Sequence, residues 1–155
     1  MRIYLAAPLF SQIQRSWNRE LADTIMEMLP GVVVILPQDF RTGGSYNNPK
    51  HYGALFRRCV HEVQSADMLL ALLDGSEVDS GVSFEMGVAY AADKPIIGIR
   101  TDFRPGADYG VNLMCARACK HIVREYSFQE DLRVVAGAIV RRMRAVMKKG
   151  GNDVG

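Results

Sequence analysis

The chain has 155 residues, of which 48% are hydrophobic and 23% charged, and this size and composition predict one compact domain. Its 19 basic and 17 acidic side chains leave a formal charge of +2, too near balance to indicate nucleic acid or an anionic membrane as the principal partner. No apolar run reaches the roughly eighteen residues that cross a bilayer, so we expect a cytoplasmic protein. The three cysteines form no CxxC pair, so we expect neither disulfides nor a structural zinc site.

Strand and helix patterns alternate along the first third of the chain. Residues 2–7 are short, apolar and β-competent, and residues 12–29 carry apolar side chains at spacings of three and four, which predicts a helix. The uninterrupted branched run 32–36 predicts a strand buried on both faces. The polar segment 38–50 that follows is long for so small a domain, and a loop of that length is typical of a functional loop.

The same alternation continues to the C-terminal end. The patterns predict, in order, a helix over 52–65, a strand over 68–73, a helix over 80–92, a strand over 95–99, a short strand around 122–123 and a helix over 132–147. Helices between strands imply parallel crossovers, hence a three-layer α/β domain with a central, mainly parallel five-stranded sheet. We expect this single domain to span residues 1–148, followed by a flexible tail over 149–155.

Ligands of such sheets bind outside the carboxyl ends of the strands, where the strand order reverses. The segment before the helix at 80–92 carries the densest chemical signal there. Asp79 can cap that helix, and Glu85 lies six residues further on, where its carboxylate could reach past Gly81. Two carboxylates at one small cavity suit glycosidic chemistry. The alternative is that Asp79 is only a cap and Glu85 a solvated residue, although the apolar neighbours of Glu85 make an unpaired charge costly.

Three further residues could complete such a site. Tyr4, in the first strand, either packs in the core or donates a hydrogen bond to Glu85. Phe10 could offer a ring face to a planar base, and Gln38 in the long loop could hydrogen-bond a base edge. The sequence has no GxGxxG, Walker, GxSxG or HExxH motif, and its histidines lack metal-ligand spacing, which argues against dinucleotide, nucleotide triphosphate, serine-hydrolase and metal sites.

Several blocks, in order and at matching spacing from residue 3 to about residue 114, resemble the nucleoside 2-deoxyribosyltransferase family. They begin with Ile3-Tyr4-Leu5-Ala6-Ala7-Pro8-Leu9-Phe10 and continue with 66–91, which holds Val78-Asp79-Ser80-Gly81 and Phe84-Glu85-Met86-Gly87, with 94–104 and with Asn112-Leu113-Met114. Because separate blocks must coincide, the match is specific. The resemblance implies a flavodoxin-like domain.

The resemblance also implies an activity and a set of roles. Glu85 would attack C1′ of a 2′-deoxynucleoside and hold the 2-deoxyribosyl group as an ester until a second free base takes it, with net retention. Tyr4 matches the tyrosine that positions this nucleophile, and Asp79 the aspartate that binds the deoxyribose hydroxyls. Asn112 and Met114 match residues that reach into a neighbouring subunit's site, which implies a homo-oligomer. No metal or redox cofactor is implied.

The chain departs from the family pattern in two places. Its tail, which ends Asp153-Val154-Gly155, does not resemble the aromatic C-terminus that closes the site in some relatives. The other departure lies before the third strand. Relatives carry an acidic residue, assigned to the base, in the helix before the third strand, where this sequence has Cys59 with Glu62 one turn on. Two alternatives stay open. One is a 2′-deoxynucleoside 5′-monophosphate N-glycosidase, which uses water as acceptor but needs phosphate donors beside the first strand. The other is a non-catalytic nucleotide-binding or sensor domain, since fold does not fix function.

Overall fold

The computed structural model describes residues 1–40, 49–105, 110–126 and 131–150. The strands are β1 (Arg2–Ala6), β2 (Val33–Ile35), β3 (Met68–Leu72), β4 (Ile96–Arg100) and β5 (His121–Arg124). The helices are α1 (Gln12–Met28), α2 (Tyr52–Ser65), α3 (Ser80–Ala91), α5 (Leu113–Ala118) and α6 (Leu132–Gly150), with short 3-10 turns at Pro37–Asp39 and Pro49–His51.

The five strands form one parallel sheet in the order β2-β1-β3-β4-β5. The order reverses at β1, which pairs with β2 on one side and β3 on the other; Tyr4 lies opposite Ile35 and Leu69. This is the flavodoxin-like order, and it puts the crevice beside the carboxyl ends of β1 and β3. The predicted three-layer α/β fold with a parallel five-stranded sheet is confirmed.

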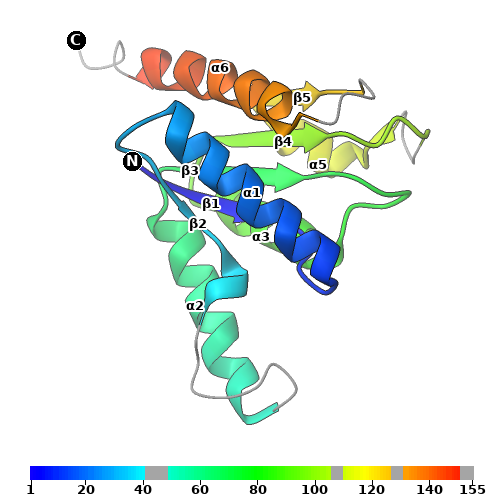
Figure 1. Cartoon of the computed structure of the whole chain (residues 1–155). Coiled ribbons are helices and arrows are strands. Elements are labelled where there is room, and N and C mark those ends of the chain that lie inside the picture. The colour runs from blue at the N-terminus through cyan, green and yellow to red at the C-terminus, as the bar shows by residue number, and fades with distance from the viewer. Residues whose placement is uncertain (41–48, 106–109, 127–130, 151–155) are drawn as a thin grey trace.

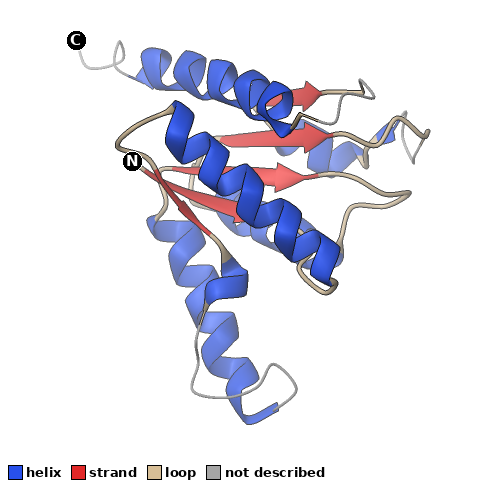
Figure 2. Ribbon diagram, viewed as in Figure 1, coloured by secondary structure: helices blue, strands red, loops and turns tan. Residues whose placement is uncertain are grey.

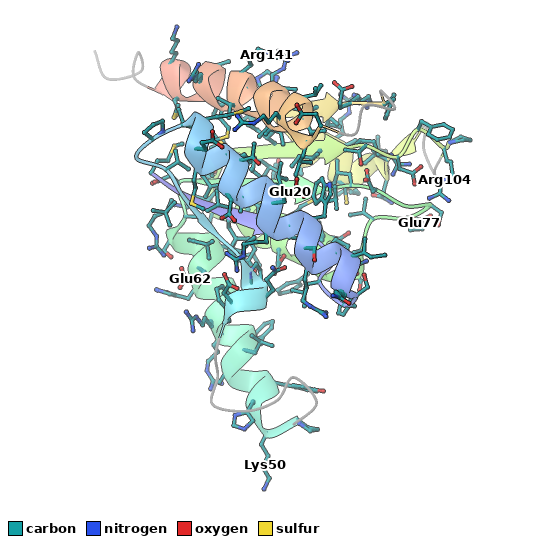
Figure 3. The ribbon with its side chains drawn as sticks, viewed as in Figure 1. Glu20, Lys50, Glu62, Glu77, Arg104 and Arg141 are labelled. Atoms are coloured by element: carbon teal, nitrogen blue, oxygen red, sulfur yellow. The ribbon has the colours of Figure 1, made fainter. Side chains whose placement is uncertain are left out.

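Helices cover both faces of the sheet (Figures 1 and 2). Helices α1 and α6 pack over one face with Leu5 and Ile99, while α2, α3 and α5 pack over the other with Tyr4 and Leu69. Alternate residues of β1 point to opposite faces, so Tyr4 faces α2 and α3 whereas Leu5 faces α1. Charged side chains such as Glu20 and Arg141 project from the outer surfaces of α1 and α6 (Figure 3). None of the helices described here is both long and apolar enough to span a membrane.

Two sequence predictions need correction or adjustment, and one helix was not predicted. Strand β2 is not buried on both faces: it is the first strand in the sheet order, and Val33 is 53% exposed. The six-residue helix α5 was not predicted, because it is too short to show a repeating apolar pattern. Helix α6 continues to Gly150, two residues past the predicted domain end at 148. Of the rest of the predicted tail, 151–155 lie outside the described residues, as do 41–48 of the long loop.

Candidate active site

A cleft of about 350 Å³ opens between α2 and α3 at the carboxyl end of β1. We call it the α2–α3 cleft. It takes residues from the turn after β1, from one side of α2 and from one side of α3, and it holds the carboxylates of Asp79 and Glu85 and the thiol of Cys59. The aromatic side chains that line it are Phe10, Tyr52, Phe56 and Phe84. The cleft therefore joins two carboxylates to a mostly apolar, aromatic wall, which suits a sugar linked to a planar base.

Glu85 and Tyr4 form the central contact of this cleft. The Tyr4 hydroxyl donates to Glu85 Oε1 at 2.5 Å, so the hydrogen bond that the sequence suggested is present. Tyr4 is fully buried, and its ring lies 6.5 Å from that of Phe40. Burial, with a smaller contribution from Asp79, raises the pKa of Glu85 to about 7, although the bond from Tyr4 opposes the rise. Burial and the nearby Glu85 charge raise the pKa of Tyr4, which keeps its hydroxyl protonated.

Asp79 is the second carboxylate of the cleft, and it caps α3. One carboxylate oxygen, Oδ1, accepts hydrogen bonds from the backbone N–H groups of Gly81 at 2.9 Å and Val82 at 3.1 Å. A Cβ at position 81 would stand 3.1 Å from that oxygen, so glycine leaves the carboxylate room. Asp79 thus has the structural role of a cap, and it also lines the cleft beside Glu85.

Phe10 and Phe84 supply ring surface at the mouth of the cleft. Phe10 lies in the turn after β1, is 74% exposed and lines the cleft. Across the cleft, the rings of Phe56 on α2 and Phe84 on α3 pack with centroids 5.7 Å apart. The sequence analysis did not single out Phe56 or Phe84. The signal for Phe56 was the spacing of Tyr52, Phe56, Cys59 and Val63, which puts all four on one side of α2.

Gln38 does not line the α2–α3 cleft, although the sequence suggested that it might bind a base. Its amide N–H donates to the Arg15 carbonyl at 2.9 Å, and its amide oxygen accepts from Asn18 at 3.2 Å. The next residue, Asp39, is paired with Arg19. The polar side chains in the described part of the loop therefore bond to α1, and Gln38 fixes the loop against that helix.

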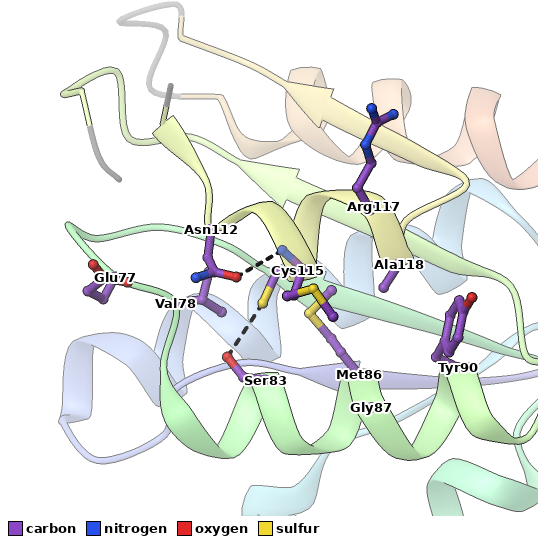
Figure 4. A pocket seen from close by; sticks show the side chains of 11 residues that line it. Glu77, Val78, Ser83, Met86, Gly87, Tyr90, Asn112, Cys115, Arg117 and Ala118 are labelled. Carbon is purple, nitrogen blue, oxygen red and sulfur yellow. Dashed lines mark hydrogen bonds between the residues drawn. The ribbon is translucent and has the colours of Figure 1, made fainter. Parts of the chain in front are cut away.

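Asn112 and Met114 lie on the far side of α3. With Ser83 and Met86 they line a separate cavity of about 450 Å³, the α3–α5 cavity (Figure 4). The Asn112 side chain caps α5 by accepting from the Met114 N–H at 3.0 Å, and Met114 is 77% exposed. Within one chain these two residues line a different cavity from Glu85.

Two features were missed in the sequence. Glu62, one turn beyond Cys59, is bonded to Arg2 at 2.5 Å, at the amino end of β1 and away from the cleft; Figure 3 labels it on α2. The buried Arg100 ties the loop before Asp79 to the loop after β4 by donating to the carbonyls of Leu73 at 2.5 Å and Gly75 at 2.7 Å. These hydrogen bonds join residues that are far apart in the sequence, so no local sequence pattern predicted them.

Comparison with known proteins gives an independent line of evidence. Residues 3–114 match the family model described as nucleoside 2-deoxyribosyltransferase. The chain is 29% identical over 126 residues to a nucleoside deoxyribosyltransferase of Limosilactobacillus fermentum, with 75% of this chain and 74% of that protein covered.

Solved structures are also similar. A conserved protein from Enterococcus faecalis V583 has a TM-score of 0.70 and 28% identity over 92% of this chain and 98% of its own. The 2-deoxyribosyltransferase of Bacillus psychrosaccharolyticus has a TM-score of 0.66 and 21% identity over 88% of this chain and 90% of its own, a likeness of fold. Since the family model spans well over half of the sequence, the chain belongs to the nucleoside 2-deoxyribosyltransferase family.

Proposed function

We propose that this protein transfers a 2-deoxyribosyl group between purine or pyrimidine bases, with Glu85 as the nucleophile. The observation that carries the proposal is the Glu85 carboxylate, held by Tyr4 at 2.5 Å inside an aromatic cleft that also contains Asp79. With a pKa near 7, Glu85 is substantially ionised at neutral pH, and an ionised carboxylate is the form that can attack carbon. Family membership supports an enzyme of this kind.

The reaction would proceed in two displacements. An oxygen of Glu85 bonds to C1′ while the C1′–N bond breaks, and the bonding electrons leave with the base, which is protonated as it departs. The sugar carbon passes through an oxocarbenium-like state, which is easier to reach without a 2′-hydroxyl. A nitrogen of the second base then attacks C1′ from the opposite face, Glu85 leaves as the carboxylate, and the new nucleoside releases a proton. Two inversions give retention.

The other predicted residues would bind the substrate. Asp79 would accept hydrogen bonds from the deoxyribose hydroxyls through the carboxylate oxygen that does not cap α3. Phe10 would stack on the base, supported by its position at the mouth of the cleft. Asn112 and Met114 would enter the cleft of a neighbouring copy, which makes the working enzyme a homo-oligomer. We place this activity in nucleoside salvage in the cytoplasm.

The direct test is base exchange. The purified protein is mixed with deoxyinosine and adenine, and products are separated by chromatography. Formation of deoxyadenosine and hypoxanthine is expected. Release of free deoxyribose without deoxyadenosine would instead favour an N-glycosidase that uses water, and tight binding without either product would favour a sensor domain.

A second experiment tests the covalent step. A 2′-fluoro-2′-deoxynucleoside should react slowly, because the electron-withdrawing fluorine destabilises the oxocarbenium-like state at C1′. Intact-mass spectrometry should then detect the fluorosugar on the protein, and peptide mapping should locate it on Glu85. Glu85→Gln is the matched control, and an adduct that persists in this variant would contradict the assignment of the nucleophile.

A further inference from the structure

The loop that leads from β3 to Asp79 is bonded at its start to the segment that follows β4. The carboxylate of Asp74 accepts from the backbone N–H groups of Thr101 at 2.6 Å and Asp102 at 3.0 Å, and also from the Thr101 hydroxyl. The Gly75 N–H donates in turn to Asp102 Oδ2 at 3.3 Å. Two loops that follow neighbouring parallel strands are therefore joined by side-chain hydrogen bonds.

Arg100 adds a second set of bonds between the same two loops. It is 2% exposed, and a buried charge needs hydrogen-bond partners inside the protein. Its guanidinium donates to the carbonyls of Leu73 and Gly75 in the first loop, and to those of Asp102 at 2.9 Å and Arg104 at 3.0 Å in the second. One buried cation thus binds two carbonyls from each loop. We call the four side chains that make these bonds the β3–β4 loop network: Asp74, Arg100, Thr101 and Asp102.

The position of Asp79 depends on this network more than the position of Glu85 does. Glu85 lies in the second turn of α3, where the buried side chains of Val82 and Met86 hold the helix against the sheet. Asp79 stands just before the helix, and its carboxylate bonds to the first turn. The chain reaches it through the exposed residues 76–77. Where the loop leaves the sheet therefore helps to decide where Asp79 lies, and the network fixes that point.

We propose that Asp74 and Thr101 are positioning residues, which hold Asp79 where its carboxylate meets the deoxyribose. The inference rests on the proposed function, in which Asp79 binds the deoxyribose hydroxyls. Its mechanism is geometric, because a displacement of about 1 Å is enough to spoil the contact between a positioned group and its substrate. Loss of the network should therefore weaken substrate binding and leave the ionisation of Glu85 unchanged.

The first test removes one bond and keeps the backbone intact. Thr101→Val retains the branched side chain but deletes the hydroxyl that donates to Asp74. The KM for deoxyinosine should rise about threefold to tenfold, with little change in kcat or in the acid limb of the pH profile. Thr101→Ser keeps the hydroxyl and should restore the KM. A serine variant as impaired as the valine variant would overturn the inference.

A double-mutant cycle shows whether the network acts through Asp79. In a protein that already carries Asp79→Asn, Thr101→Val should cost little more, because the carboxylate that the network positions is gone. The same cost of Thr101→Val in both backgrounds would mean that the network acts elsewhere, and the inference would be wrong.

An aspartate at the other end of β3 supplies the matched control. Asp67 accepts from the Arg2 N–H at 2.7 Å, so it also ties neighbouring strands together, but at the amino end of the sheet. Asp74→Ala should raise the KM more than Thr101→Val does, whereas Asp67→Ala should leave it within about twofold. An equal rise in both alanine variants would show a general loosening of the sheet and would contradict positioning. Thermal unfolding of each variant checks that the fold is retained.

A binding measurement does not depend on turnover. In Glu85→Gln, which should not exchange bases, isothermal titration calorimetry with deoxyinosine should give a Kd about threefold to tenfold higher when Thr101→Val is added. An unchanged Kd would overturn the inference alone. Absence of exchange in the unmodified protein would instead overturn the proposed function, so the two failures are distinguishable.

Discussion

The two sides of helix α3 face cavities of different character. Gly81, Phe84 and Glu85 line the α2–α3 cleft, whereas Ser83 and Gly87 line the α3–α5 cavity. Helical spacing of 3.6 residues per turn sorts neighbouring positions in this way, because residues three or four apart share a side and adjacent ones diverge. The short helix α3 thus contributes residues to the lining of both cavities.

The larger of these two cavities is not the one that holds the partly buried carboxylate of Glu85. The α3–α5 cavity measures about 450 Å³ and the α2–α3 cleft about 350 Å³, yet only the cleft pairs a carboxylate with a buried hydroxyl among the described residues. Glu77, in the lining of the larger cavity, is exposed, whereas Glu85 is partly buried with a raised pKa. The comparison teaches that burial raises the pKa of a carboxylate even when a hydroxyl donates to it, and that cavity volume alone does not mark where such a group lies.

The largest expected effect separates these two carboxylates. Glu85→Ala should lower base exchange by about three orders of magnitude or more, because the other carboxylate of the described cleft, Asp79, is held as the cap of α3. Glu77→Ala, the same change at the exposed carboxylate of the α3–α5 cavity, should leave exchange within about threefold. Initial rates of deoxyadenosine formation measure both. Near-normal exchange in Glu85→Ala would remove the distinction between the cavities.

Asp79→Asn comes next, with an expected loss of about tenfold to a hundredfold in kcat/KM. Asparagine caps a helix as well as aspartate does, but it presents an amide and no charge to the deoxyribose hydroxyls. Asp131→Asn is the matched control, since Asp131 accepts from the Arg133 N–H at 2.8 Å at the start of α6. A large fall in melting temperature in Asp79→Asn without a change in kinetics would leave Asp79 as a cap only.

Met114→Ala should cost about tenfold in exchange, even though Met114 lies outside its own chain's cleft. The side chain is 77% exposed, so its loss should not destabilise the chain by itself. Mixing Met114→Ala with Glu85→Ala should restore part of the activity, because some clefts then combine an intact Glu85 with an intact Met114 from the other copy. Full activity of Met114→Ala, or no recovery on mixing, would contradict sharing of the α3–α5 side between copies.

The fold was predictable where local pattern and environment agree. The apolar run of β3 and the spacing of apolar residues in α2 predicted both elements to within one residue, because the pattern of apolar side chains in each segment matches its buried face. Strand β2 has a similar run, but its place at the sheet edge depends on strand order, and Val33 stays exposed. Helix α5 had no signal beyond the capping residue Asn112.

A site residue was predictable where its own chemistry restricts its role. It was not predictable where contacts with residues distant in the sequence decide that role. Glu85 stands out because a carboxylate in an apolar helix needs a partner, and Tyr4 is that partner. Gln38 had the right chemistry for a base, yet its amide is taken by α1, which no sequence pattern reveals. Cys59 reaches the cleft beside Glu85 only through the packing of α2 on the sheet. The sequence thus shows which polar groups require a partner, and only the tertiary structure shows what that partner is.

The smallest effect concerns stability. The pKa of Glu85 is about 7 in the folded chain against 4.5 for an unperturbed carboxyl, so the folded state binds more protons between these values. Stability should therefore fall as the pH rises from about 4.5 to 7, and the full cost of the buried charge is present above pH 7.

Glu85→Gln removes that charge while keeping the shape of the side chain. At pH 8 it should stabilise the protein by up to roughly 3 kcal/mol, a rise in melting temperature of about 5–10 °C, and near pH 5 most of the gain should vanish. Glu77→Gln, the same change at an exposed carboxylate, is the matched control. Thermal unfolding at equal protein concentration across this pH range measures both. An inactive Glu85→Gln that is more stable at pH 8 would mean that the charged nucleophile lowers the stability of the folded protein. Equal stability at both pH values would mean that the carboxylate of Glu85 is solvated, and the contrast with Glu77 would be lost.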